Sequence, residues 1–479
     1  MRIEYIESLS GVNAPLVFFR QQGVAPDKKM TELALQLGFE VMPEFSGREE
    51  KIRFCSVPGG PDILQVGLGK DPDMRAFRKA VSQLVEAASL HEIEKLVFHP
   101  AAFGGLAFDD LVFESLLGLL LITYRFDSLQ AEKKEKSIWP ETVLLFGDEH
   151  KKQAELARDT FESVRLVRDL VNTPANIATP EYMAQAAKKL AQEYGFFCQV
   201  FDPAACEEMK MGCFASVFRG SDTPARFIVL DSNPEADQRP LVFVGKGVTF
   251  DTGGISLKPA ANMHEMKSDM AGAATVLGLF KMLGLRGEKR RVVGILPCTE
   301  NVPGSRATKP GDVVFAMNGK SVEILNTDAE GRLILADALC YSEKYQPECL
   351  VDLATLTGAC VVALGGKIAG LFCEDEHLQG AIREHGQKNG EDFWPLPLPD
   401  EYKKDLKSEV ADLKNMGKRE GGAIYAALFL QHFIPEKTPW AHLDIAGPAR
   451  GKENSGYWKT GGTGFGLRTL WELVSSWKK

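Results

Sequence analysis

Short apolar runs alternate with longer amphipathic stretches over residues 1 to about 150. The apolar runs are residues 17–20, 64–69, 95–100 and 141–147. Between them, residues 74–90 have the spacing of a helix with one apolar face. Strands that alternate with helices are typical of βαβ units and a largely parallel sheet. The pattern therefore predicts an N-terminal α/β domain over residues 1–150.

A polar, charge-rich helical stretch follows over residues 148–170 and has no fully apolar face. Such a pattern is typical of a connector between domains. Pro174 and Pro180 come next, and each disfavours helix at the residue before it. We predict a helical connector over residues 151–171 and a second, larger domain over residues 172–479.

In the second domain the apolar runs are shorter, and each leads into sequence that is rich in Gly, Asp or Asn. These runs are residues 226–231, 241–247, 291–298, 349–358 and 441–447. They predict buried parallel strands, with helices over 266–285 and 330–345 between them. The expected fold is α/β, with a mixed, mostly parallel sheet flanked by helices. In such sheets ligands bind at the carboxyl ends of the strands, so the candidate chemistry belongs in those loops.

Composition narrows the class of protein. The 479 residues are 44% hydrophobic and 25% charged, which is typical of a globular protein. A net charge of −9 argues against a chain built to neutralise phosphate. Nine scattered cysteines without a CxxC pair indicate a reducing compartment. The most apolar segment, residues 116–122, is too short to span a bilayer, and the first residues lack a secretory pattern. We expect a cytoplasmic protein that does not associate with membranes.

Three separated segments combine glycines with charged side chains. Residues 244–259 carry Lys246, Asp251 and Lys258; residues 266–274 carry Asp269; and residues 326–339 carry Asp328, Glu330 and Arg332. Taken singly, an acidic residue at a helix start is usually a cap, and a lysine beside a strand is usually a solvated charge. Neither a GxxxxGK[ST] phosphate loop nor an HExxH zinc motif is present in the sequence.

Taken together, these segments predict a metal site. All of their carboxylates lie at strand ends or helix starts, on the side where an α/β sheet collects its loops. Four carboxylates within ~5 Å of each other would repel by several kcal/mol in a partly dry site. Two divalent cations would neutralise them, and such hard oxygen ligands suit Zn²⁺, Mn²⁺ or Mg²⁺.

These motifs resemble those of the leucyl aminopeptidase (M17) family. The octapeptide NTDAEGRL at 326–333 resembles the family signature without a mismatch, and 244–259 and 266–274 resemble its metal-binding stretches. Further similar segments are 172–176, 351–359, 411–415, 441–447 and 461–470. The resemblance covers most of residues 165–475. It is weak over 1–150, where it implies a variable α/β domain that resembles a macro-type fold, although no complete nucleotide-binding loop is present there.

The resemblance implies a role for each matching residue. The implied metal ligands are Lys246, Asp251, Asp269, Asp328 and Glu330. Lys258 matches the lysine that stabilises the oxyanion, and Arg332 matches the arginine that holds a bicarbonate ion as the base. The implied lining of the pocket for the first side chain consists of Met266, Asn326, Thr355 and Gly358.

The implied activity is the release of N-terminal amino acids from peptides, with a preference for Leu and other bulky neutral residues. The implied cofactors are two divalent ions, Mn²⁺ or Zn²⁺, that activate a water, and the implied assembly is a homohexamer. Two alternatives stay open. The same site could serve a Cys-Gly dipeptidase, and the basic run 286–291 could bind DNA. A solvated loop is the simpler interpretation of that run, because six residues make few phosphate contacts and the whole chain is acidic.

Overall fold

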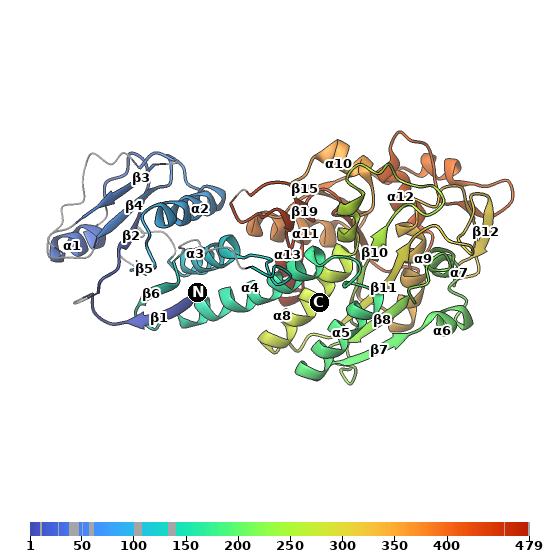
Figure 1. Ribbon diagram of the computed structural model, residues 1–479, viewed down its shortest axis with the longest axis horizontal. Helices are drawn as coiled ribbons and strands as arrows, with labels where there is room; N and C mark the ends of the chain where they lie inside the picture. The colour runs from blue at the N-terminus through green and yellow to red at the C-terminus, as the bar shows by residue number, and fades with distance from the viewer. Residues whose placement is uncertain are drawn as a thin grey trace. The chain divides into compact units, whose positions relative to one another are not determined.

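The computed structural model describes residues 1–9, 12–26, 28–37, 47–49, 51–56, 62–99, 108–132, 140–454 and 456–477. They form two compact units: Met1–Glu162 with Glu453–Lys459, and Ser163–Lys452 with Thr460–Lys479. The stretch predicted as a connector is one helix, α4 (Lys151–Asn172; Figure 1). The division between the units falls inside this helix, between Glu162 and Ser163. All candidate site residues, from Lys246 to Gly358, belong to the second unit.

The first unit is built on a six-stranded sheet in the order β1-β6-β5-β2-β4-β3. Its elements are β1 (Arg2–Ile6), β2 (Leu16–Arg20), α1 (Lys28–Gln36), β3 (Ile52–Cys55), β4 (Ile63–Gly67), α2 (Met74–Leu90), β5 (Lys95–Phe98), α3 (Phe108–Thr123) and β6 (Thr142–Phe146). Neighbouring strands are parallel except β3, which is antiparallel to β4. The predicted strands and the predicted helix over 74–90 are confirmed.

The most apolar segment, residues 116–122, lies in α3, and its side chains are buried, as predicted. Among the described residues, no helix combines the length and the apolar character that crossing a membrane requires.

The second unit is built on a nine-stranded sheet in the order β16-β15-β18-β14-β9-β11-β8-β7, with β10 paired to β11. These strands are β7 (Phe197–Phe201), β8 (Arg226–Asp231), β9 (Leu241–Gly245), β10 (Gly247–Asp251), β11 (Val292–Asn301), β14 (Cys349–Ala354), β15 (Ile368–Cys373), β16 (Asp392–Pro395) and β18 (Trp440–Asp444). Its helices are α5 (Pro180–Tyr194), α6 (Pro203–Glu208), α7 (Gly212–Phe218), α8 (Ala271–Arg286), α9 (Gly331–Ser342), α10 (Gly358–Leu364), α11 (Glu376–Asn389), α12 (Gly422–Gln431) and α13 (Leu467–Ser476), with the 3₁₀ turns η2 (Met263–Ser268), η3 (Glu343–Tyr345) and η4 (Asp400–Leu406). A smaller sheet joins β12 (Asp312–Phe315), β13 (Ser321–Ile324) and β17 (Leu413–Lys414), and a ribbon joins β19 (Arg450–Gly451) and β20 (Gly461–Gly462).

The centre of this sheet, β18-β14-β9-β11 with β10, is parallel, as predicted. The prediction of a parallel strand is wrong for residues 226–231, because β8 is antiparallel to both of its neighbours, β11 and β7. An apolar run indicates that a strand is buried on both faces, but it does not indicate whether the strand is parallel or antiparallel to its neighbours.

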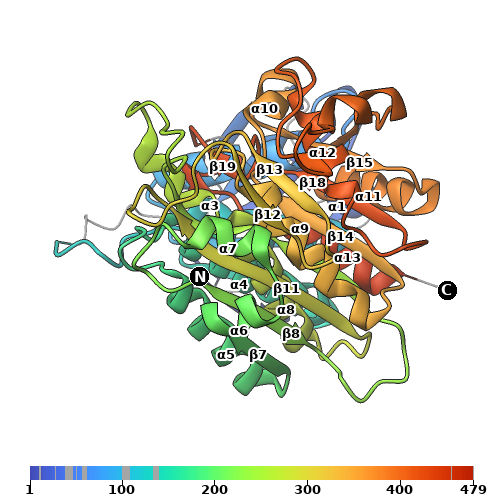
Figure 2. The ribbon, with the colours of Figure 1, turned by 90° about the vertical axis from the view of Figure 1, so that its right-hand side faces the viewer.

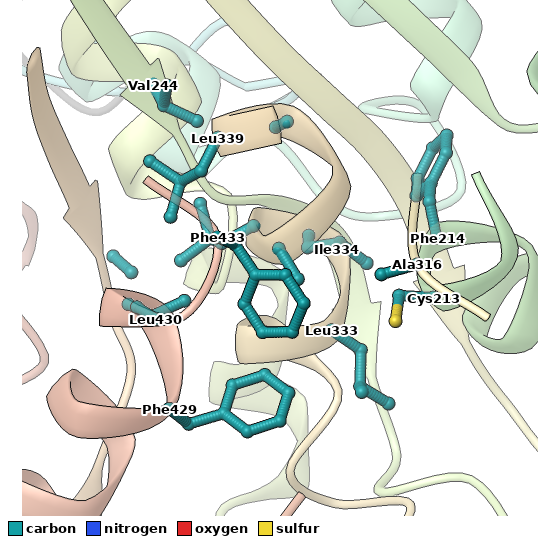
Figure 3. Packing of buried hydrophobic residues seen from close by; sticks show 14 of the residues in the cluster. Cys213, Phe214, Val244, Ala316, Leu333, Ile334, Leu339, Phe429, Leu430 and Phe433 are labelled. Atoms are coloured by element: carbon teal, nitrogen blue, oxygen red, sulfur yellow. The ribbon is translucent and has the colours of Figure 1, made fainter. Parts of the chain in front are cut away.

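Helices cover both faces of the sheet. Helices α5 and α8 pack on one face and α7 and α9 on the other (Figure 2). Helix α9 is embedded between α7 and α12, where Leu333, Ile334 and Leu339 lie among the aromatic side chains of Phe214 and Phe433 (Figure 3). Because every one of these side chains is buried, the position of α9 is fixed by packing. The turn that precedes α9 is therefore held at the carboxyl edge of the sheet.

Candidate metal centre

Lys246 lies between the end of β9 and the start of β10, with its side chain almost completely buried. Its Nζ is 2.8 Å from Asp269 Oδ2 and 2.8 Å from Glu330 Oε1, and it donates a hydrogen bond of 3.1 Å to the Thr355 carbonyl. A side chain at residue 331 would place its Cβ 2.7 Å from Nζ, so Gly331 leaves the room that the lysine occupies. Lys246 thus joins three separate segments of the chain.

Lys258 forms a second junction. Its Nζ is 2.8 Å from Asp251 Oδ2 and also pairs with Asp328 Oδ1. Asp251 ends β10, and Asp328 lies on the turn before α9, as predicted. The backbone between Asp251 and Lys258 turns through Gly253 at φ +87°, where a Cβ would lie 2.8 Å from Asp328 Oδ1. Glycine is needed there both for the positive φ and for the close approach.

Carboxylates outnumber cations in this cluster. Asp251, Asp328 and Glu330 each place one carboxylate oxygen within 4.8 Å of the others. With Asp269, four carboxyl groups share two ammonium groups, which leaves two negative charges in excess in a largely buried place when all four are ionised.

The surplus negative charge raises the pKa of the acids and of the lysine alike. Burial raises the pKa of the Asp269 and Glu330 carboxyl groups, and the Asp251 carboxylate raises both further against the pull of Lys246. Burial lowers the pKa of Lys246, but the attraction of the surrounding carboxylates outweighs it and holds this pKa above its usual range. Hard oxygen donors with surplus negative charge are the chemistry that divalent cations bind, so the donor set fits such ions.

Arg332 and Asn415 form a second layer behind the turn. Arg332 is buried, and its Nη1 donates to the Asn415 carbonyl at 2.9 Å. Burial lowers the pKa of Arg332 to about 10, opposed by Glu330, so the guanidinium stays charged at neutral pH. No hydrogen-bond acceptor for its Nε is found within the described part of the chain.

The fully buried Asn415 accepts at Oδ1 from Leu325 N (2.9 Å) and donates from Nδ2 to Asn326 O (2.7 Å). It therefore pairs with the backbone of the turn that carries Asp328.

Three of the four residues expected to line a pocket form hydrogen bonds with acidic residues of the cluster. Thr355 Oγ1 donates to Asp269 Oδ1 at 2.7 Å, and Asn326 Oδ1 accepts from Asp328 N at 2.9 Å. The Met266 carbonyl accepts from Asp269 N at 3.3 Å. Gly358 begins α10, and a Cβ built on it would meet no atom within 4 Å.

Sequence reasoning singled out neither Asn301 nor Asn415. Asn301 Nδ2 donates to Asp251 Oδ1 at 2.8 Å. The available signal for Asn301 was its place just beyond the apolar run 291–298, at the predicted carboxyl edge, whereas Asn415 lay within a segment quoted only for its resemblance.

The basic run 286–291 is engaged in contacts that compete with phosphate binding. Arg290 pairs with Glu348, and Arg291 Nη2 lies 2.7 Å from Asp231 Oδ2. These pairs favour the structural interpretation of the run.

Comparison with known proteins identifies relatives over most of the chain. A family model described as the cytosol aminopeptidase family, catalytic domain, matches residues 165–471. A protein named probable cytosol aminopeptidase from Nitratidesulfovibrio vulgaris is 51% identical over 432 residues, which cover 87% of this chain and 85% of the relative. A probable cytosol aminopeptidase from Syntrophobacter fumaroxidans is 43% identical over 452 residues, which cover 91% and 89%.

Two solved structures are similar over nearly the whole length. The bottromycin maturation enzyme BotP in complex with Mn has a TM-score of 0.85 at 34% identity, with 97% of this chain and 99% of that chain covered. A tomato leucine aminopeptidase mutant has a TM-score of 0.86 at 33% identity, with 99% and 96% covered.

Proposed function

The chain belongs to the cytosol aminopeptidase (M17) family and is therefore a metal-dependent exopeptidase. We propose that it releases Leu and other bulky neutral residues from peptide N-termini. The single observation that carries this proposal is the buried cluster in which four carboxylates share two lysines. A site with that surplus charge suits divalent ions, and the substrate's free α-amine, in its neutral form, could then bind one of them.

We propose Lys246, Asp251, Asp269, Asp328 and Glu330 as the ligands of two divalent ions, Mn²⁺ or Zn²⁺. The convergence of their side chains supports this set. When bound, such ions would lower the pKa of a water towards neutrality and polarise the scissile carbonyl. Lys246 would have to lose its proton to become a ligand, so metal binding by this residue should release protons.

Lys258 is proposed to stabilise the oxyanion of the tetrahedral state. Its side chain is 22% exposed, between Asp251 and Asp328, so it is accessible from the solvent side. Burial opposes its charge, but Asp251 and Glu330 outweigh burial and raise the pKa of Lys258. Its ammonium group is therefore charged at neutral pH and can donate a hydrogen bond to developing negative charge.

Arg332 is proposed to hold a bicarbonate ion that serves as the general base. The support is a buried, charged guanidinium whose Nε has no acceptor among the described residues. Met266, Asn326, Thr355 and Gly358 are proposed to line the pocket for the first side chain; the space beside Gly358 is consistent with that role. One methylene changes binding by only ~1–3 kcal/mol, so we expect broad specificity.

We further propose that the catalytic site belongs entirely to the domain 172–479, which follows the connector 151–171 in the sequence. We also propose that the protein is a cytoplasmic homohexamer. Gel filtration checks the assembly: elution near six times 52.6 kDa is expected, and elution at 52.6 kDa would contradict it. DNA binding is disfavoured because Arg290 and Arg291 are held by carboxylates. A salt-dependent gel shift on duplex DNA checks this point.

A panel of substrates tests the proposed function. Leucine amide and leucyl peptides should be cleaved, and N-acetyl-leucine amide, which lacks the free amine, should not. Cys-Gly and other dipeptides belong in the same panel. A marked preference for Cys-Gly over every leucyl substrate would replace the proposed substrate class, and equal cleavage of the acetylated amide would contradict exopeptidase action.

A further inference from the structure

Asn301 lies directly opposite a proposed metal ligand. It ends β11, and its register partner in the parallel strand β10 is Asp251. The register shifts by one residue between Val248 and Phe250. Without that bulge, Asp251 would face residue 302 instead. The bulge therefore brings the asparagine and the carboxylate together at the carboxyl edge of the sheet.

The side chain of Asn301 contacts both turns that carry ligands. Its Nδ2 donates to Asp251 Oδ1 at 2.8 Å and to the Thr327 carbonyl at 3.0 Å, one residue before Asp328. Its own carbonyl accepts from Thr252 N at 2.9 Å, which ties down the turn after β10. Asn301 is buried, so water does not compete for these groups.

These contacts decide which oxygen of Asp251 faces the cluster. Oδ1 accepts from Asn301 Nδ2 and from Gly253 N at 2.9 Å, so both of its lone pairs are occupied. Oδ2 lies on the other side, 2.8 Å from Lys258 Nζ. At residue 254 a Cβ would lie 2.8 Å from Asn301 Oδ1, so Gly254 leaves the room that the amide needs.

We propose that Asn301 is a positioning residue of the metal centre: it holds Asp251 with Oδ2 directed at the cluster and fixes the distance between the two ligand-bearing turns. The proposal rests on the proposed function. Partners that orient metal ligands typically contribute 10–100-fold in metal affinity. An amide is suited to this place because it donates to two acceptors, whereas a carboxylate there would repel Asp251.

Metal titration of the chelator-treated protein tests the proposal. The variants are Asn301→Ala and Asn301→Ser, whose side chains are too short to reach both acceptors. The matched control is Asn389→Ala, because Asn389 is also buried and its Nδ2 donates to the His385 carbonyl at 2.9 Å, within α11. Calorimetric titration with Mn²⁺ and with Zn²⁺ gives the dissociation constants, and circular dichroism gives the melting temperature of each metal-free protein.

Both Asn301 variants are expected to bind metal about 10–100-fold more weakly than the parent. The Asn389→Ala variant should have the same metal dissociation constant as the parent. Parent affinity in a folded Asn301 variant would overturn the proposal, as would a lowered melting temperature without any change in affinity. A parent protein that binds metal but releases no N-terminal residue would contradict the proposed function instead. The two failures are therefore distinguishable.

Discussion

The two edges of the sheet in the second unit both carry buried or half-buried charges, but they balance them differently. At the amino edge, Arg290 pairs with Glu348 and Arg291 pairs with Asp231, one cation for each carboxylate. At the carboxyl edge, Lys246 and Lys258 are shared among four carboxylates.

This difference separates structural charges from functional ones. A one-to-one pair neutralises itself and anchors strand ends. A buried surplus of negative charge raises the energy of the folded protein unless a further cation compensates it, so its presence indicates a ligand. The comparison predicts that perturbing the carboxyl edge changes metal binding and activity, and that perturbing the amino edge changes stability alone.

Removing the metal should have the largest effect. Chelation is expected to reduce hydrolysis of leucine amide to background, because no side chain of the cluster replaces the water activation that divalent ions supply. Adding Mn²⁺ or Zn²⁺ should restore it. The assay is leucine release before and after chelation, with metal content checked by elemental analysis. Full activity in a verified metal-free preparation would mean that the surplus negative charge at the carboxyl edge does not serve metal-dependent catalysis.

Asp269→Asn should lower metal occupancy while the fold persists, because the substitution removes one negative charge and keeps the shape of the side chain. Elemental analysis after dialysis measures the occupancy. Asp375→Asn is the matched control, since Asp375 caps α11 through Leu378 N and lies outside the cluster. Unchanged metal stoichiometry in the Asp269 variant would mean that this carboxylate only pairs with Lys246 and Thr355.

Lys258→Ala should lower kcat by about 10²–10³-fold, because the ammonium group is expected to donate to charge that develops only in the transition state. Steady-state kinetics on leucine amide at saturating metal gives kcat and KM separately. Lys309→Ala is the control, because Lys309 is exposed and pairs with Asp312. A variant with kcat within twofold of the parent would mean that Lys258 only neutralises the carboxylates of Asp251 and Asp328.

Arg291→Ala should have the smallest effect on chemistry. It leaves the Asp231 carboxylate buried without its guanidinium, at a cost of about 1–3 kcal/mol in the free energy of unfolding. Urea denaturation measures that loss, and metal content and kcat should match the parent. If metal binding fell together with stability, the two edges would not be independent.

Much of the fold followed from local pattern. Residues 74–90 became α2 with the predicted bounds, where Asp73 Oδ1 accepts from Ala76 N to cap the first turn. The three segments of the candidate cluster were also recognisable in the sequence, because glycines beside acidic residues at strand ends form a pattern that is local in the chain. The set of ligands within them was implied by the resemblance to the family. Helical periodicity and turn chemistry are properties of neighbouring residues, so the sequence expresses them directly.

The sequence determined which residues are apolar, which are charged and where the chain turns. Only the tertiary structure decided that β8 runs antiparallel, that one lysine is shared by Asp269 and Glu330, and that Asn301 and Asn415 hold the ligand-bearing turns. The reason is distance along the chain: Asn301 reaches back 50 residues to Asp251, and Asn415 reaches back 89 residues to Asn326. Such contacts depend on strand order, register and a bulge, and no local periodicity encodes them.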